Sequence, residues 1–149
     1  MTRPPRLYLA ASLFSSFERD RNSAIAQHLI GRGYYVFLPQ DVRTSTGERP
    51  LADVIFKECV NGINESDLIV GLVDGPDVDS GTAWELGYAY AHKKPIVVLR
   101  SDYRSAENGP VNIMIQFSSR LVLANKPGTD APDAIQALID AVDRALTNR

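Results

Sequence analysis

The sequence has 149 residues, of which 44% are hydrophobic and 23% charged, so we expect a globular protein with one domain over 1–149. Its net charge is −2 and its Lys and Arg residues are scattered, which predicts no surface for nucleic acid or for a membrane. The one cysteine excludes an internal disulfide, and no apolar run is long enough for a signal peptide or a membrane span, so we expect a cytoplasmic protein.

Apolar runs alternate with segments of helical periodicity along the whole chain. The apolar runs predict buried strands at 7–11, 34–38, 68–73, 95–99 and 120–124. The periodic segments predict helices at 17–32, 52–65, 80–93 and 131–146. Strands that alternate with helices pair in parallel through right-handed crossovers. The chain therefore predicts an α/β fold with a three-layer, doubly wound, flavodoxin- or Rossmann-like parallel sheet of about five strands.

The spacing of apolar residues predicts which helix side chains reach the core. In the first two helices these are expected to be Ile25, Leu29, Ile30, Val54, Ile55, Cys59 and Ile63.

Carboxylates gather after the third predicted strand. Asp74, Asp77 and Asp79 lie in a loop, and Glu85 lies in the second turn of a helix that Ser80 is expected to cap. Ligands bind at the carboxyl ends of the strands in such sheets, so we predict an active site here. The helix N-terminus favours an ionised Glu85, suited to nucleophilic attack. The alternative interpretation is that the aspartates only shape a turn and that Glu85 is solvated.

Several other chemistries do not fit the sequence. It has no Gly-x-Gly-x-x-Gly after the first strand, no phosphate-binding loop ending in Gly-Lys-Ser/Thr and no Gly-x-Ser-x-Gly. Two histidines and one cysteine do not suggest a zinc site, and the acidic loop is only a weak magnesium motif, so we predict neither a metal nor a cofactor. Carboxylate chemistry on a neutral or weakly polar substrate remains, with glycosyl transfer as the leading example.

Three segments resemble the nucleoside 2-deoxyribosyltransferases. Residues 79–89 contain Asp79, five residues and then Glu85, residues 109–114 read Gly-Pro-Val-Asn-Ile-Met, and residues 7–14 are similar to the family's first strand and loop. The resemblance extends from 7 to about 115. It implies that Glu85 attacks the anomeric carbon of a 2′-deoxyribonucleoside and forms a covalent deoxyribosyl-enzyme. A second base then attacks from the other face, so that configuration is retained.

The resemblance also implies roles for other side chains. Tyr8 would orient Glu85, and Asp79 would hold sugar hydroxyls, above all the 5′-hydroxyl. Asn112 would complete the site of a neighbouring subunit, with Met114 packed close by. The protein would then be a homo-oligomer built from dimers, up to a hexamer, that binds a 2′-deoxyribonucleoside and a free nucleobase. Without the resemblance, Tyr8 would be interpreted as a core tyrosine, Asn112 as a turn residue and Met114 as a side chain that fills a gap in the core.

Four further positions are expected at the substrate. Gly81 leaves room for a ligand, Phe14 would cover the base, and Gln40 and Asp41, after the second strand, would read the base edge.

The chain departs from the family pattern at Cys59, where some relatives carry a carboxylate near the leaving base. A neutral thiol is not an ordinary general acid. The proton for the leaving base could therefore come from Asp79, Glu58, Asp41 or water.

Two other functions are compatible with these residues. One is a hydrolase of 2′-deoxynucleoside 5′-monophosphates that uses the same carboxylate with water as acceptor, for which Ser12, Ser15, Ser16 and Ser80 could hold the phosphate. The other is a nucleotide-sensing or partner-binding domain on the same scaffold. The sequence leaves open which bases are accepted.

Overall fold

The computed structural model describes residues 3–102, 111–125 and 130–147, and its strands form a five-stranded parallel sheet. The strands are β1 (Arg6–Ala10), β2 (Tyr35–Phe37), β3 (Leu68–Leu72), β4 (Ile96–Arg100) and β5 (Leu121–Ala124). They lie side by side in the order β2-β1-β3-β4-β5, which is the flavodoxin-like order. The predicted doubly wound parallel sheet is confirmed.

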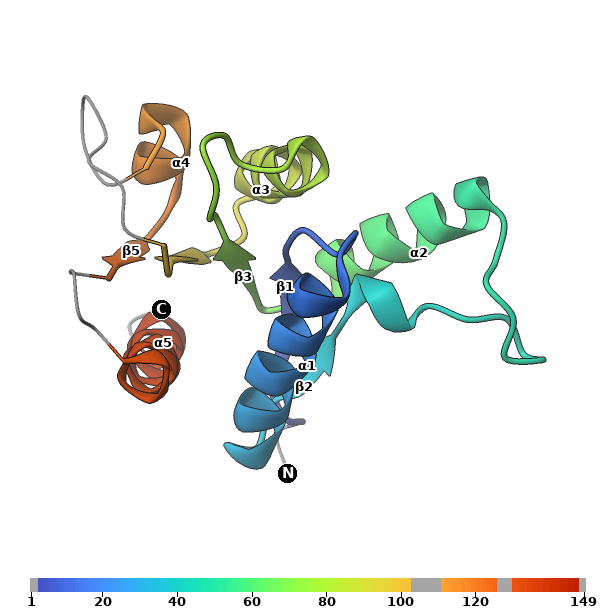
Figure 1. Ribbon diagram of the computed structural model, residues 1–149, viewed down its shortest axis with the longest axis horizontal. Coiled ribbons are helices and arrows are strands. Elements are labelled where there is room, and N and C mark those ends of the chain that lie inside the picture. The colour runs from blue at the N-terminus through green and yellow to red at the C-terminus, as the bar shows by residue number, and fades with distance from the viewer. Residues whose placement is uncertain (1–2, 103–110, 126–129, 148–149) are drawn as a thin grey trace.

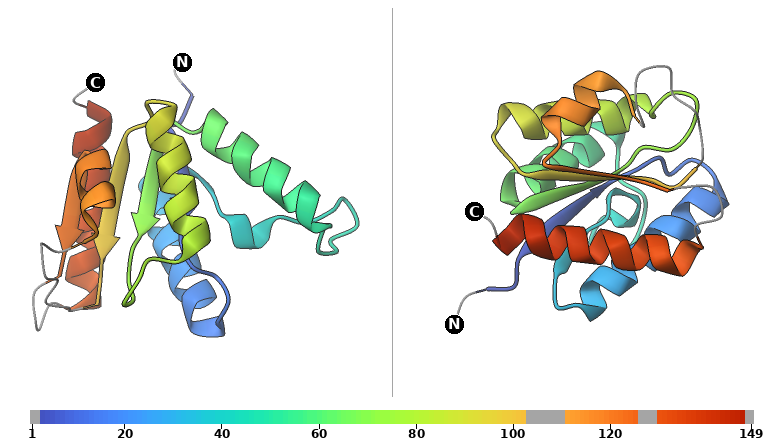
Figure 2. Two further views of the ribbon diagram at one scale, coloured as in Figure 1. Left: turned by 90° about the horizontal axis from the view of Figure 1, so that it is seen from above. Right: turned by 90° about the vertical axis from the view of Figure 1, so that its left-hand side faces the viewer.

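Helices cover both faces of the sheet (Figures 1 and 2). On one face lie α1 (Ser16–Gly31) and α5 (Ala131–Thr147), and on the other lie α2 (Ala52–Glu65), α3 (Ser80–Ala91) and α4 (Ile113–Ser118). Successive strand residues point to opposite faces, so Leu9 joins the first apolar core and Tyr8 the second. None of the described helices is long and apolar enough to cross a membrane.

The predicted strands and helices are all present, with ends that differ by at most two residues. The prediction that Ile30 and Val54 point into the core is wrong, because these residues are 46% and 40% exposed. Ile30 lies outside the buried stripe of α1, which consists of Asn22, Ile25, Ala26 and Leu29. Val54 belongs to the N-terminal half of α2, which extends beyond the sheet (Figure 1).

Two local features were not predicted correctly. Helix α4 has only six residues, too few to show a helical repeat of apolar positions. Ser80 is not the cap of α3. Asp79 caps it, because its carboxylate accepts a hydrogen bond from the backbone N–H of Thr82 at 3.0 Å. Ser80 is then the first helical residue, and since both residue types cap helices well, the sequence alone favoured neither.

Candidate active site

A tyrosine of β1 and a glutamate of α3 form the centre of the candidate site. Tyr8 is fully buried, and its hydroxyl donates a hydrogen bond of 2.6 Å to Oε1 of Glu85. The close approach of α3 to the sheet depends on Gly71 of β3, where a Cβ would lie 3.0 Å from side-chain atoms of Leu86 and Val98. A larger residue there would push α3 outward and separate the pair.

Glu85 has an unusual protonation equilibrium. Burial raises its pKa to about 7, and the charge of Asp79 adds to this, while the hydrogen bond from Tyr8 opposes it. The pKa of Tyr8 is raised, mainly by burial and then by the charge of Glu85, so its hydroxyl stays a donor. Burial outweighs the expected effect of the helix dipole, because Glu85 lies beyond the first turn of α3.

Replacing Glu85 with glutamine is expected to raise the free energy of unfolding at pH 8 by about 2 kcal/mol. Because its pKa is raised from 4.5 to about 7, the folded protein binds the Glu85 proton more tightly than the unfolded chain does. Ionisation of Glu85 therefore costs stability as the pH rises through this range. Glutamine can still accept the hydrogen bond from Tyr8 but carries no charge. Urea unfolding of both proteins at pH 5 and pH 8 checks this, and a difference that does not grow with pH would contradict it.

Asp79 and Gly81 stand together at the start of α3. Oδ2 of Asp79 accepts hydrogen bonds from the backbone N–H and the hydroxyl of Thr82, at 3.0 and 3.2 Å. Among the described residues, no group donates to its Oδ1, which remains available to a ligand hydroxyl. A Cβ on Gly81 would lie 3.2 Å from Oδ2, so the glycine leaves room for this carboxylate.

Phe14, Gln40 and Asp41 lie at the same edge of the sheet, in the segments that follow β1 and β2. Phe14 is 75% exposed. Gln40 lies in a short 3-10 turn, η1 (Pro39–Asp41), and its amide nitrogen donates to the Arg19 carbonyl and to Ser23 Oγ, both at 2.9 Å. Asp41 ends the turn and is exposed. Gln40 therefore also ties the turn to α1.

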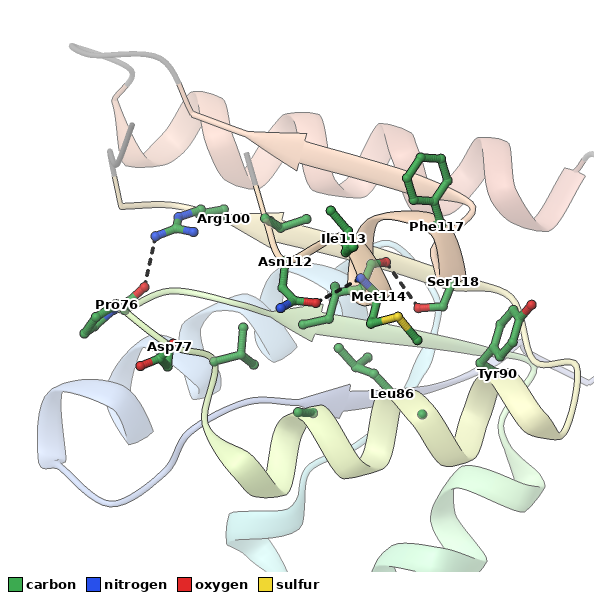
Figure 3. Close-up of a pocket in the computed structure, with 16 residues that line it drawn as sticks. Pro76, Asp77, Leu86, Tyr90, Arg100, Asn112, Ile113, Met114, Phe117 and Ser118 are labelled. Atoms are coloured by element: carbon green, nitrogen blue, oxygen red, sulfur yellow. Dashed lines mark hydrogen bonds between the residues drawn. The ribbon is translucent and has the colours of Figure 1, made fainter. Parts of the chain in front are cut away.

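Asn112 and Met114 lie on another side of α3. Together with Leu86 and Tyr90, they line an open cavity of about 930 Å³ between α3 and α4 (Figure 3). The described residues that line it include none of Tyr8, Asp79 and Glu85. Oδ1 of Asn112 caps α4 by accepting from the Met114 N–H at 2.9 Å, and the Met114 side chain is 75% exposed. The structure therefore does not bring these two residues to Glu85 of the same chain. Gly109 and Pro110 of this motif lie outside the described residues.

Asp74 and Cys59 both stand out in the sequence, but their surroundings could not be predicted from it. Asp74 forms an ion pair with Arg21 and accepts hydrogen bonds from the backbone N–H and hydroxyl of Ser101, so it fixes the loops after β3 and β4 against α1. Cys59 is partly buried and packs against the same apolar core as Tyr8, and burial raises the pKa of its thiol. Within the described ranges, no three His, Cys, Asp or Glu side chains are grouped closely enough to hold a metal ion.

Comparison with solved structures finds several proteins of the same fold. A 2-deoxyribosyltransferase from Bacillus psychrosaccharolyticus is 24% identical over 87% of this chain and 95% of its own, with a TM-score of 0.66. A 2-desoxiribosyltransferase from Leishmania mexicana is 20% identical over 95% and 98%, with a TM-score of 0.68. A CMP N-glycosidase from Clostridium botulinum is 20% identical over 93% and 98%, with a TM-score of 0.59. Comparison with curated protein sequences gives no significant match.

The sequence profile of one family covers most of the chain. The profile, described as nucleoside 2-deoxyribosyltransferase, matches residues 7–122. This span contains Tyr8 of β1, the start of α3 with Asp79 and Glu85, and helix α4 with its cap Asn112. The chain therefore belongs to the nucleoside 2-deoxyribosyltransferase family.

Proposed function

We propose that this protein transfers the 2-deoxyribosyl group of a 2′-deoxyribonucleoside from one nucleobase to another. The observation that carries the proposal is the partly buried carboxylate of Glu85, held by the Tyr8 hydroxyl at 2.6 Å at the ligand-binding edge of the sheet. A carboxylate fixed in this way has one oxygen committed to a donor and the other available for attack. Membership of the family and the fold shared with two deoxyribosyltransferases support the same activity.

The reaction would proceed in two displacements. The uncommitted oxygen of Glu85 attacks C1′, the bond from C1′ to the base nitrogen breaks, and the base leaves with the electron pair and takes up a proton. In the second step a nitrogen of the incoming base attacks C1′ from the opposite face, releases the Glu85 carboxylate and loses its proton. Two inversions give net retention. Tyr8 would direct Glu85 toward the sugar and stabilise its charge whenever the ester is broken.

The charge of the site favours a nucleoside over a nucleotide. Asp79 offers a carboxylate oxygen to which none of the described residues donates, and this oxygen would accept a hydrogen bond from a 5′-hydroxyl but would repel a 5′-phosphate. The second candidate is hydrolysis of a 2′-deoxynucleoside 5′-monophosphate. The fold shared with a CMP N-glycosidase supports it, but of the candidate phosphate donors Ser15 already caps α1 and Ser80 follows the Asp79 carboxylate directly.

A second copy of the chain would complete each site. Asn112 and Met114 lie away from Glu85 of their own chain, so they would act in the site of a neighbour. Large apolar side chains remain exposed on α2, α3 and α4, as expected for a face covered in an oligomer; they are Phe56, Trp84, Tyr90, Ile113, Met114 and Phe117. We therefore propose a symmetric homo-oligomer built from dimers.

Product analysis tests the proposed reaction. Purified protein is incubated with deoxyinosine, with and without adenine, and in parallel with deoxynucleoside 5′-monophosphates. We expect deoxyadenosine to form only when adenine is present. Free deoxyribose and hypoxanthine without a new nucleoside, or cleavage of the monophosphates alone, would indicate a hydrolase. Ligand binding without any product would indicate a sensing domain.

The rate of exchange is expected to depend on pH through Glu85. The nucleophile is the ionised form, and its pKa is raised to about 7. Below this pH, kcat/KM should fall about tenfold per pH unit as Glu85 takes up a proton, and above it kcat/KM should level off. Initial rates with deoxyinosine and adenine between pH 5 and pH 8 check this. A profile that is flat between pH 5 and pH 6.5 would contradict the assignment of Glu85.

A further inference from the structure

An arginine and an aspartate at the end of β4 hold a glycine of the neighbouring loop. Strand β4 ends at Arg100 and lies beside β3, and the loop that leaves β3 contains Asp74 and Gly75. Nη2 of Arg100 donates to the Gly75 carbonyl oxygen at 2.9 Å (Figure 3), and Oδ2 of Asp102 accepts from the Gly75 N–H at 3.0 Å. Nε of Arg100 also donates to Oδ1 of Asp102 at 3.0 Å. One ion pair therefore binds both backbone polar groups of Gly75.

A second carboxylate joins the same two loops from the other side. Oδ1 of Asp74 accepts from the backbone N–H of Ser101 at 2.5 Å and from that of Asp102 at 3.2 Å. Each loop thus supplies a carboxylate to backbone N–H groups of the other. The side chain of Arg100 is only 8% exposed, and hydrogen bonds of charged groups are stronger in such surroundings than in water. The loop after β3 is therefore fixed firmly to the end of β4 at Gly75.

The loop between Gly75 and Asp79 is fixed mainly at its two ends. Among the described residues, no hydrogen bond involves residues 76–78, although Val78 packs against the apolar core beneath α3. The next hydrogen bond along the loop is that of the Asp79 carboxylate, which caps α3 through the Thr82 N–H. The position of Asp79 therefore depends both on this cap and on the contacts that hold Gly75.

We propose that Arg100 and Asp102 are positioning residues, which hold Gly75 so that the carboxylate of Asp79 stays directed at the 5′-hydroxyl of the nucleoside. They act through Asp79 and not on the reacting atoms. Loss of their contacts should let the loop and Asp79 move, and this should weaken binding of the sugar more than it slows attack, because Glu85 lies within α3 itself. The role of the 5′-hydroxyl rests on the proposed function, whereas the hold on Asp79 does not.

Hydrogen exchange of single backbone amides tests the hold on Asp79 without any substrate. In Asp102→Ala the Gly75 amide loses its acceptor and should exchange faster than in the wild-type protein. Because the release should reach Asp79, the Thr82 amide that it caps should also exchange about tenfold faster, while the amides of β1 stay protected. Asp143→Ala is the matched control, since it removes the carboxylate of another Arg–Asp ion pair, at α5, and should change neither amide. Faster exchange at Gly75 alone would overturn the proposal.

A substrate without the 5′-hydroxyl gives the kinetic readout. The value of kcat/KM for base exchange is measured with deoxyinosine and with 2′,5′-dideoxyinosine, each with adenine as acceptor. The wild-type protein and Asp143→Ala should prefer deoxyinosine by roughly 10- to 100-fold, as expected for a hydrogen bond to a carboxylate. In Asp102→Ala the preference should fall below about threefold, mainly through a higher KM for deoxyinosine. A general loss of structure would instead slow both substrates alike.

A second variant keeps the test decisive if Asp102→Ala does not fold. Asp102→Asn preserves the size of the side chain, but its one amide oxygen cannot replace both carboxylate oxygens, so its preference should lie between those of the wild-type protein and Asp102→Ala. A wild-type preference in the folded variants would overturn the proposal. If the wild-type protein itself shows no preference, the contact between Asp79 and the 5′-hydroxyl is refuted, and hydrogen exchange alone decides whether Arg100 and Asp102 position Asp79.

Discussion

Replacing Glu85 with alanine is expected to lower kcat/KM for base exchange by roughly 10⁴-fold, because the variant lacks the oxygen that would bond to C1′. Tyr8 cannot substitute for it, since the raised pKa of its hydroxyl keeps that group protonated. Rates are best compared at pH 8, where most Glu85 in the wild-type protein is ionised. Chromatography of the nucleosides formed from deoxyinosine and adenine gives the measurement.

A loss of activity in this variant has to be separated from a loss of fold. Glu48→Ala removes an exposed carboxylate between η1 and α2 and should keep wild-type exchange. Circular dichroism and urea unfolding should show that Glu85→Ala is still folded at pH 8, because the removal of a partly buried charge offsets the loss of the acceptor for the Tyr8 hydroxyl. Exchange by Glu85→Ala within tenfold of the wild-type rate would exclude Glu85 as the nucleophile.

Much of the fold can be predicted from the sequence, because parallel strands are buried on both faces and appear as continuous apolar runs. The run at 68–73, for example, corresponds to β3, all of whose residues are buried. Helix α4 could not be predicted, because it is held by the Asn112 cap and by packing on α3 rather than by a periodic pattern. The exposure of Val54 could not be predicted from the sequence either, since it arises because α2 extends past the sheet.

The candidate site was harder to predict than the fold. Tyr8 and Glu85 are 77 positions apart, and their hydrogen bond depends on the register of β1 with β3 and on the room that Gly71 leaves for α3. Spacing alone cannot give this, and the family resemblance suggested it. The raised pKa of Glu85 arises from burial, which only the packed structure provides. The helix-dipole argument made from the sequence considered only the charge at the helix N-terminus, and it therefore favoured ionisation of Glu85 and a lower pKa.

Combining two impaired variants in one oligomer is expected to restore activity if neighbouring chains share the site. Glu85→Ala lacks the nucleophile. Asn112→Ser shortens the side chain but keeps a residue that can cap α4, and it should lower kcat/KM roughly 10- to 100-fold. In a mixed dimer, one site receives Glu85 from one chain and Asn112 from the other. A purified mixed dimer has one intact site out of two, so about half of the wild-type activity should return.

The same mixture distinguishes a shared site from a site within one chain. If Asn112 acted on Glu85 of its own chain, every chain with Glu85 would lack Asn112, and mixing could restore nothing. The two variants are co-expressed with different affinity tags, and the doubly tagged oligomer is purified so that mixed assembly is certain. Because the Asn112 and Glu85 regions lie on different sides of α3, we expect the doubly tagged protein to exceed both parents in exchange rate. Activity that stays at the level of Asn112→Ser alone would contradict the donated residue, even if the protein is oligomeric.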